Sequence, residues 1–236
     1  MTLNHELSVI IPVLNEAATI NSTIEALKRL SFGGKLEIIV SDGSLRGSTL
    51  RAVTHKDVLS VMGKKGRGVQ MNKGASVASG DILLFLHSDT LLPQDALDQI
   101  VQVSGSDDVV GGAFDLGIQS EKRAFRLIEN VASMRSRLTR IPYGDQAIFI
   151  KNDFFHGIGG YKAMPLMEDV ELMQRIKKTG HRIRFIPSKV RTSPRRWEKE
   201  GILYCTLRNW LLITLWFLGV SSEKLAGCYP VAKHMT

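Results

Sequence analysis

Two acidic side chains follow apolar runs that are typical of buried strands. Asp42 begins an Asp-Gly-Ser sequence after residues 36–41, and Asp89 ends a His-Ser-Asp sequence after residues 81–86. A carboxylate at a strand end can accept a hydrogen bond from a nucleotide base or ribose, and it suits Mg²⁺ or Mn²⁺. Each acid also has a structural alternative, because Asp42 fits a turn with an Asx cap and Asp89 fits a helix cap before Pro93.

A second group of charged residues lies in the C-terminal half. Glu168 and Asp169 form an adjacent acidic pair, whose structural alternative is a negatively charged first helical turn favoured by the helix dipole. Arg195 and Arg196 precede Trp197, and such arginines suit a pyrophosphate or a phosphorylated acceptor through bidentate contacts. The alternative for this second motif is an ordinary basic surface with a packing tryptophan.

Weaker signals exclude several other kinds of site. Residues 66–74 are glycine-rich and basic but match neither a Walker loop nor a dinucleotide-binding fingerprint, so a solvated helix start is a fair alternative. The histidines other than His87 are scattered singly, and we assign none of them to catalysis. Without an H-x-x-x-H or C-x-x-C pair, a structural zinc site is not expected.

The elements that must position these residues alternate in type along the chain. Short apolar, β-branched runs predict strands at 7–13, 36–41, 58–61, 81–86, 109–116, 146–151 and 182–186. Helical spacing predicts helices at 16–30 with Asn15 as N-cap, and at 69–79, 93–103, 121–138, 167–179 and 197 to about 218. This order predicts an α/β fold with a mostly parallel, Rossmann-like sheet and helices on both faces. Ligands of such sheets bind at the carboxyl ends of the strands, so we expect residues 14–16, 42–44 and 87–89 to share one crevice.

Composition limits the class of protein. The 236 residues are 44% apolar and 23% charged, which are globular values and fit one domain over residues 1–236. The net charge of +8 favours an anionic partner: nucleic acid, a phosphorylated molecule or an anionic membrane. The two cysteines suit a reducing cytosol, and no targeting segment or run long enough to span a membrane is present.

The final predicted helix is apolar nearly all round, and a helix of that kind is normally buried. Residues 175–199 before it hold ten Lys or Arg against one acid. We therefore expect this helix to make the protein peripheral to the inner face of a membrane or a homodimer, with packing on the domain's own sheet as the alternative.

Taken together, the motifs resemble glycosyltransferase family 2 enzymes of the GT-A fold over about residues 7–229. The resemblance is carried by Val9-Ile-Ile-Pro-Val-Leu-Asn-Glu16, the Asp-Gly-Ser sequence, the acid after the 81–86 run and the Glu-Asp pair. It is closer still to the radical SAM/selenodomain-associated, arsenosugar-type glycosyltransferases. The segments that carry this second resemblance are Gly66-Arg67…Gln70-Met-Asn72, Leu86-His-Ser-Asp-Thr90, Tyr143-Gly-Asp-Gln146, Pro165-Leu-Met-Glu-Asp-Val170 and Arg195-Arg-Trp197.

The resemblance implies an inverting transfer of a sugar from a nucleoside diphosphate donor, a UDP- or GDP-sugar, to an unknown hydroxyl acceptor. It places Asp169 as general base beside Glu168, and Asp89 with His87 at a divalent metal, Mn²⁺ or Mg²⁺. The donor nucleotide would contact Pro12, Val13, Asn15, Glu16, Asp42, Arg67, Gln70 and Ser88. The acceptor or diphosphate would contact Tyr143, Gly144, Asp145, Gln146, Arg195, Arg196 and Trp197. Residues 1–105 would form the nucleotide-sugar-binding half, 106–200 the acceptor and catalytic half, and 201–236 the C-terminal apolar helix.

Three departures from the family pattern concern the donor and metal sites. His87 replaces the first acid of the usual D-x-D motif, and Arg46 stands where a second acid usually follows the Asp-Gly-Ser sequence. The segment 112–115 lacks an arginine that close relatives often carry before the phenylalanine. These differences bear on metal affinity and donor identity.

Three other classes remain as alternatives. A nucleotidyltransferase shares the layered sheet and a metal carboxylate but calls for a glycine-rich basic loop after the first strand. A non-catalytic nucleotide- or membrane-binding module would be favoured by a missing base or metal carboxylate, and both acids are present. A nucleic-acid binder fits the charge alone, but no nucleic-acid-binding signature accompanies it, so we expect no nucleic-acid partner.

Overall fold

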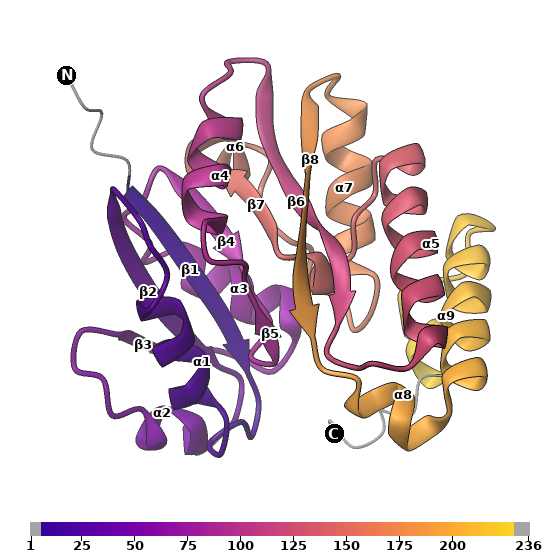
Figure 1. The fold of residues 1–236 in the computed structure, drawn as a ribbon, viewed down its shortest axis with the longest axis horizontal. Coiled ribbons are helices and arrows are strands. Elements are labelled where there is room, and N and C mark those ends of the chain that lie inside the picture. The colour runs from indigo at the N-terminus through magenta and orange to yellow at the C-terminus, as the bar shows by residue number, and fades with distance from the viewer. Residues whose placement is uncertain (1–5, 229–236) are drawn as a thin grey trace.

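A computed structural model describes residues 6–228 as one α/β unit built on an eight-stranded sheet (Figure 1). The strands are β1 Glu6–Val13, β2 Lys35–Asp42, β3 Leu59–Met62, β4 Ile82–Phe85, β5 Thr90–Leu91, β6 Val109–Ile118, β7 Ile148–Lys151 and β8 Arg182–Thr192. The helices are α1 Ile20–Lys28, α2 Ser48–Ala52, α3 Arg67–Ala75, α4 Ala96–Ser104, α5 Arg123–Thr139, α6 Asn152–Gly157, α7 Glu168–Lys178, α8 Arg195–Glu200, α9 Ile202–Phe217 and α10 Ser222–Gly227. A 3₁₀ turn, η1, covers Gly144–Gln146.

The strands lie in the order β3-β2-β1-β4-β7-β6-β8-β5. The first four are parallel to one another, as are β6 and β8, whereas β7 and β5 pair antiparallel with their neighbours. The predicted mostly parallel sheet is therefore confirmed, with β7 as an antiparallel strand at its centre. Because β4 runs parallel to β1, the two strands end at the same edge of the sheet.

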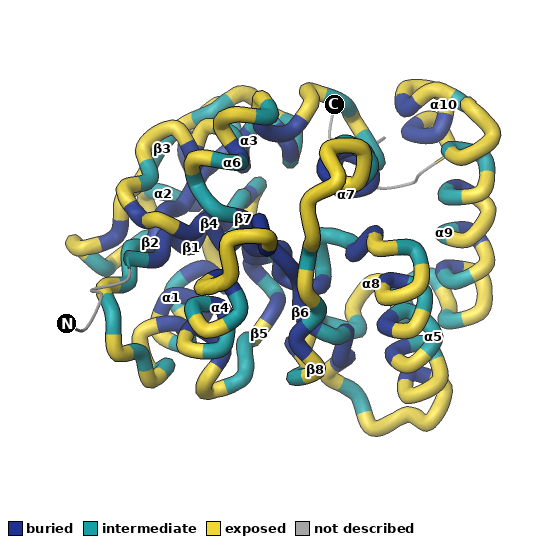
Figure 2. The backbone as a smooth tube through the Cα atoms, turned by 90° about the horizontal axis from the view of Figure 1, so that it is seen from above, coloured by how far each residue is buried: buried dark blue, intermediate teal, exposed yellow. Residues whose placement is uncertain are grey.

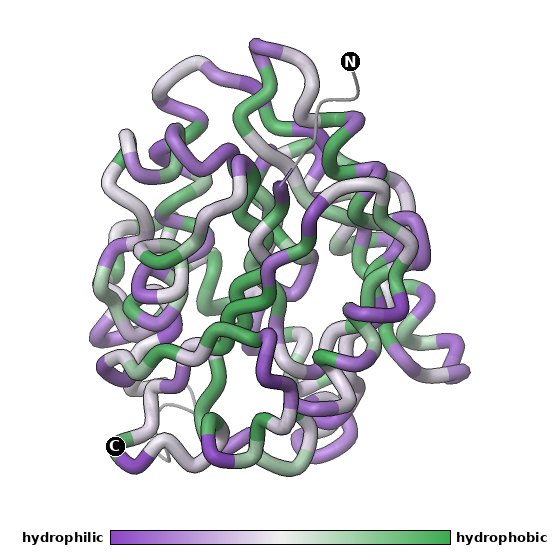
Figure 3. The backbone as a smooth tube through the Cα atoms, turned by 90° about the vertical axis from the view of Figure 1, so that its left-hand side faces the viewer, coloured by the Kyte–Doolittle hydropathy of each residue, from purple (hydrophilic) through white to green (hydrophobic). Residues whose placement is uncertain are grey.

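Two apolar cores flank the sheet, one on each face. Alternate residues of β1 point to opposite faces, so Val9 and Ile11 join the core under α1 and α4, while Ile10 joins the core under α3, α6 and α7. Buried segments occupy the centre of the molecule in Figure 2, and Figure 3 shows the apolar segments of the sheet running through its interior. The prediction of helices on both faces is confirmed.

The helix predicted from residue 16 begins four residues later, so Asn15 is not its N-cap. Asn15 has a φ of 60°, and the carbonyl of Glu16 accepts from the N–H groups of Thr19 and Ile20 in a turn that precedes α1. The left-handed conformation at Asn15 turns the chain away from β1 before the helix starts, and asparagine tolerates it better than most residues.

The final predicted helix is two helices. Gly201 has a φ of 90°, a conformation that L side chains rarely adopt, and it separates α8 from α9. Only Cys205, Arg208 and Leu212 of α9 are buried, so this helix packs on the domain by one face. Among the described residues no helix is both long and apolar enough to cross a membrane.

Smaller differences concern short elements. The sequence did not predict α2, β5, α6 or α10, each six residues or shorter. The last predicted strand runs on past Ile186 to Thr192, because β8 continues beyond an irregularity in its pairing with β6 near Phe114 and Asp115. This extension carries the chain to the start of α8, at the same end of the sheet as the ends of β1 and β4.

Candidate functional site

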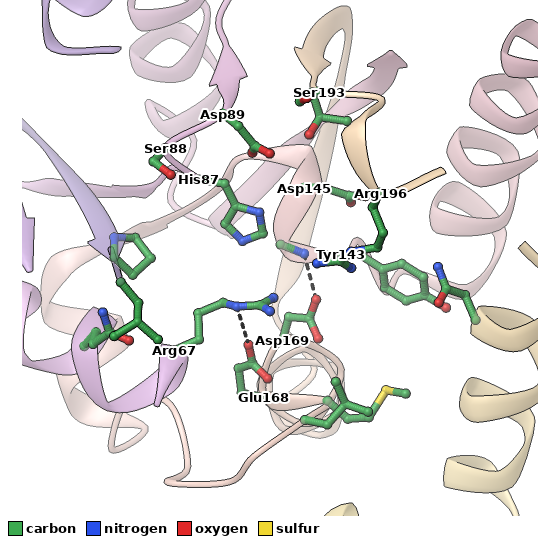
Figure 4. A pocket seen from close by; sticks show the side chains of 18 of the residues that line it. Arg67, His87, Ser88, Asp89, Tyr143, Asp145, Glu168, Asp169, Ser193 and Arg196 are labelled. Carbon is green, nitrogen blue, oxygen red and sulfur yellow. Dashed lines mark hydrogen bonds and ion pairs between the residues drawn. The ribbon is translucent and has the colours of Figure 1, made fainter. Parts of the chain in front are cut away.

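A cavity of about 460 Å³ lies beyond the ends of β1 and β4. It is bordered on one side by the ends of these strands and α3, and on the other by the 143–145 loop, the start of α7, α8 and α9 (Figure 4). Of the residues predicted from the sequence, it is lined by Pro12, Val13, Glu16, Arg67, Gln70, His87, Ser88, Asp89, Tyr143, Gly144, Asp145, Glu168, Asp169, Arg195, Arg196 and Trp197. The ends of β1 and β4 thus meet at one space, as the strand-end argument predicted, whereas residues 42–44, which it also placed there, do not line the cavity.

Asp42 is brought close to this region but does not line the cavity. Its carboxylate is fully buried and accepts hydrogen bonds from the backbone N–H groups of Ser44, at 2.7 Å, and Thr49, at 3.1 Å. These bonds close the turn after β2 and hold the first turn of α2, which is the Asx-cap interpretation. Asn15 also lies outside the cavity lining, where its side chain accepts from the Ser48 hydroxyl.

Two buried glutamine amides hold the backbone around the cavity. Gln70 lines the cavity, but its Nε2 donates to the carbonyls of Val13 and Ser41, which fixes the ends of β1 and β2. Gln146 does not line it: Nε2 donates to the Phe114 carbonyl, and Oε1 accepts from the N–H of Tyr143 at 3.1 Å. Gln146 therefore shapes the 143–145 loop from behind.

His87 projects into the cavity as a neutral base. Burial lowers its pKa to about 3, and the positive charges of Arg67 and Arg196 add to the effect. The Nε2 atom is itself buried and has no hydrogen-bond partner among the described residues. An unpaired imidazole nitrogen that stays unprotonated at neutral pH is a potential metal ligand or hydrogen-bond acceptor.

Asp89 lies near the same part of the cavity, with its side chain one-third exposed. Its Oδ2 lies 3.3 Å from Nη2 of Arg195, an ion pair that joins the residue before β5 to the first residue of α8. The described residues contain no group of three or more His, Cys, Asp or Glu side chains placed to hold a metal ion. A cation here would therefore need oxygen ligands from a bound phosphate or from water in addition to protein atoms.

The start of α7 supplies the acids on the opposite side. Asp169 accepts from the N–H of Gly144 at 2.7 Å and from the N–H of Val170 at 2.8 Å, which fixes its carboxylate at the cavity wall (Figure 4). Glu168 is buried and lies 3.4 Å from Nε of Arg67, and burial raises the pKa of Glu168. Met167 just before them has a φ of 69°, a strained conformation for a side chain of this type.

Asp145 on this wall has a raised pKa. Burial, helped by the negative charge of Asp169 and opposed by the Arg135 guanidinium, raises the pKa of Asp145 to about 6. Burial also lowers the pKa of Arg135 to about 10. Asp145 thus lies in a weakly solvated space, where its carboxyl group holds its proton more tightly than in water.

Several residues in or beside the cavity were missed by the sequence analysis. Arg135 does not line the cavity but stacks on Tyr143, which does, with its guanidinium carbon 3.3 Å from the ring centroid, and nothing in the local sequence distinguishes it from the other arginines of α5. The inner face of α9 contributes Asn209, Leu212 and Ile213. Their i, i+3, i+4 spacing was a usable signal, because Asn209 is a polar residue at the start of an apolar run.

A family model described as "Glycosyl transferase family 2" matches residues 8–167. A probable glycosyltransferase of Bacillus subtilis is 24% identical over 221 residues, which cover 83% of this chain and 51% of that protein. A glucosyl-3-phosphoglycerate synthase of Mycobacterium tuberculosis is 33% identical over 96 residues, 37% of this chain and 30% of that protein. The chain therefore spans about half of the first relative and less of the second.

A similar solved structure is a mannosyltransferase from Pyrobaculum calidifontis in complex with GDP-Man and Mn²⁺. It superposes with a TM-score of 0.64 at 23% identity, over 80% of this chain and 57% of that one. At this identity the likeness shows a shared fold.

Proposed function

The chain belongs to glycosyl transferase family 2 and has the GT-A fold, and from this premise we propose that it is a glycosyltransferase that uses a nucleoside diphosphate sugar. The observation that carries the proposal is the cavity, where Asp89 and the neutral His87 lie on one side and the fixed carboxylate of Asp169 lies on the other. We expect residues 1–105 to hold the donor and residues 106–200 to supply the acceptor site and the base.

The donor would lie against the ends of β1 and β4. Pro12, Val13 and Glu16 line this side of the cavity, and we expect them to contact the base and the ribose. Asp42 would act here as a support, since both of its oxygens are already engaged by backbone N–H groups. The relative from Pyrobaculum was solved with GDP-Man, so GDP- and UDP-sugars are the donors to test first.

The residues around Asp89 fit a divalent cation that is shared with the donor. Asp89 offers a partly exposed carboxylate and His87 an unpaired, unprotonated nitrogen, which suit a site completed by diphosphate oxygens. When bound, Mn²⁺ or Mg²⁺ would offset the charge that develops on the leaving diphosphate. Arg195, which now pairs with Asp89, and Arg196 can contact the same phosphates by bidentate hydrogen bonds.

Asp169 is the acid we propose as general base for the acceptor hydroxyl. The Gly144 and Val170 N–H groups hold its carboxylate in place at the cavity wall, whereas Glu168 is paired with Arg67. With one base on the side opposite the leaving diphosphate, attack in line would invert the anomeric carbon. Asp145 belongs to the same wall, and the negative charge of Asp169 contributes to its raised pKa of about 6.

Within the family, the motifs shared with the radical SAM/selenodomain-associated transferases support placement in that subgroup. The segments are those around Gln70, His87, Asp145, Asp169 and Arg196, and each of the five contributes residues to the cavity lining. Gln70 lines the cavity through a carbonyl-bound amide. Membership of this subgroup would predict that this protein uses the same acceptor as the other members.

The experiment that tests the function is calorimetry of the protein with GDP, UDP, GDP-mannose and UDP-glucose, each with and without Mn²⁺, followed by assays for release of the nucleoside diphosphate. We expect one nucleotide series to bind in a metal-dependent manner, and the sugar form to release its diphosphate when the acceptor is present. Release of pyrophosphate from a nucleoside triphosphate would instead identify a nucleotidyltransferase. Tight binding without any turnover over a broad acceptor set would favour a non-catalytic module.

A further inference from the structure

The outer face of α9 is apolar, exposed and free of charge. Seven large side chains on it are 55–75% exposed: Leu203, Tyr204, Leu207, Trp210, Leu211, Phe217 and Leu218. Their spacing places them on one side of the helix, and Figure 2 shows exposed segments along the side of α9 that faces away from the domain. We call these seven residues the α9 outer face.

The inner face of the same helix carries its charge. Arg208, the one charged residue between positions 202 and 217, is buried and lies 2.5 Å from Oε2 of Glu200. Asn209, Leu212 and Ile213 line the cavity from this side. An ordinary surface helix turns its apolar stripe inward and its charged side chains outward, whereas α9 turns apolar side chains both ways and its one charge inward.

A contiguous apolar face of this kind on a folded protein marks a docking surface. Two occupants fit an apolar face along a helix of sixteen residues: a second copy of this chain, or a membrane surface. The charges around the face decide between them.

The surroundings of the α9 outer face are basic. Residues 121–140, which include α5 beside α9 in Figures 1 and 2, contain six Lys or Arg against two acids. One of those acids, Glu129, is fully buried and paired with Arg126 and Lys189. At the start of α9, the helix α8 adds the exposed Lys199, and Lys122 at the start of α5 pairs with Glu198.

A two-fold dimer through this face would bring two copies of this basic rim together, and like charges across an interface oppose association. An anionic lipid surface complements the same rim and receives the apolar side chains at once. Trp210 and Tyr204 add the aromatic side chains that sit at the boundary between lipid headgroups and acyl chains.

We propose that the α9 outer face docks this protein on an anionic membrane surface, with α9 lying parallel to the membrane plane. The helix enters the headgroup region with Leu207, Trp210 and Leu211, and the exposed Arg123, Arg140 and Lys199 contact lipid phosphates. Because the inner face of α9 lines the cavity, docking brings the cavity next to the bilayer.

Vesicle co-sedimentation tests the proposal without use of the transferase activity. We expect the protein to bind phosphatidylcholine vesicles that contain phosphatidylglycerol, to bind pure phosphatidylcholine vesicles weakly, and to be released by salt. Leu207→Glu with Leu211→Glu should lower the vesicle partition coefficient by about tenfold or more, because it places two charges in the docking face. The matched control is Val77→Glu, an exposed apolar position after α3 in the other half of the molecule, which should bind as the unmodified chain does.

Tryptophan fluorescence supplies a second readout. Of the three tryptophans, Trp197 packs against Phe125 and lines the cavity, and Trp216 donates to Gln174. Trp210 is the exposed one, so a blue shift on vesicle addition should come from it. Trp210→Phe should remove that shift and keep most of the binding. Circular dichroism of each variant separates loss of docking from loss of fold.

The result that overturns the proposal is equal, salt-insensitive sedimentation of the folded double variant and the unmodified chain, or no binding to anionic vesicles at all. A concentration-dependent dimer in analytical ultracentrifugation that the double variant abolishes, with no vesicle binding, would assign the face to a second copy instead. Both outcomes leave the nucleotide experiment above unaffected, so failure here and failure of the proposed function are distinguishable.

Discussion

The two walls of the cavity are built differently. The first wall, formed by the ends of β1 and β4 and by α3, is supported by polar side chains that backbone groups satisfy: behind it Asp42 accepts from two N–H groups, and Gln70 donates to two carbonyls. The second wall, formed by the 143–145 loop and the start of α7, holds Asp145, whose pKa is raised by burial and by the charge of Asp169, near Arg135, whose pKa burial lowers. A wall fixed by hydrogen bonds to backbone suits a ligand that must be held, whereas a wall with a shifted carboxyl pKa suits a group that must move a proton.

The largest expected effect is a loss of turnover when Asp169 of the second wall is substituted. Asp169→Asn keeps the size of the side chain and one acceptor oxygen for the Gly144 N–H, but it cannot take a proton. We expect turnover to fall by about 10²–10⁴, with donor and metal binding retained. Single-turnover assays of nucleoside diphosphate release measure the rate, and calorimetry measures donor affinity.

The control for Asp169 is its neighbour. Glu168→Gln should cost less turnover, because Glu168 is paired with Arg67 rather than held by backbone N–H groups. A fully active Asp169→Asn protein beside an inactive Glu168→Gln protein would move the base to Glu168. Loss of donor binding in Asp169→Asn would place this acid with the donor.

The second effect concerns the metal. Asp89→Ala should remove the Mn²⁺-dependent part of donor binding and leave the melting temperature nearly unchanged, because its side chain is one-third exposed and its contact with Arg195 is a surface ion pair. His87→Ala should weaken metal-dependent binding less. Donor titrations with and without Mn²⁺ measure both, and unchanged metal dependence in Asp89→Ala would contradict the assignment.

The third effect is a loss of stability when Asp42, which supports the first wall, is substituted. Asp42→Ala should lower the free energy of unfolding by about 1–2 kcal/mol, because the turn after β2 and the start of α2 lose their cap. Asp42→Asn, which keeps one acceptor oxygen, should cost less. Chemical denaturation gives both values. An Asp42→Ala protein of normal stability that no longer binds nucleotide would make Asp42 a direct donor ligand.

The smallest effect is a pH dependence at the second wall. Burial raises the pKa of Asp145 from 3.8 to about 6, so the folded state binds this proton more tightly than the unfolded state does. The stability contributed by the protonated form is complete below pH 3.8 and is lost as the pH rises through about 6. Relative to Asp145→Asn, the unmodified chain should therefore lose melting temperature between these values. A constant difference across this range would place Asp145 in a more polar environment.

The parts of the fold that could be predicted from sequence are those with a local signal. The parallel strands and α7 were predictable, because apolar alternation and the acids at the start of α7 are local signals. The break in the last helix at Gly201 was not, because a single glycine is tolerated within a helical pattern and its φ of 90° depends on where β8 delivers the chain.

The candidate site also contains residues that the sequence predicts and residues that it does not. The strand-end rule predicted that His87 and Asp89 would lie in one crevice with residues 14–16, and it placed Asp42 there as well. Only the three-dimensional structure shows that backbone N–H groups use both oxygens of Asp42. Arg135 carries no local signal at all. Its place over Tyr143 depends on how α5 packs beside the 143–145 loop.

The most direct test of the central claim, that the first wall holds the donor and the second wall reacts, is a crystal structure with a nucleoside diphosphate and Mn²⁺. The account predicts the base and ribose against Pro12 and Val13, the metal between Asp89 and the diphosphate, and an unobstructed Asp169 facing the empty sugar position. A nucleotide bound against Asp145 and Asp169, with the first wall empty, would contradict it.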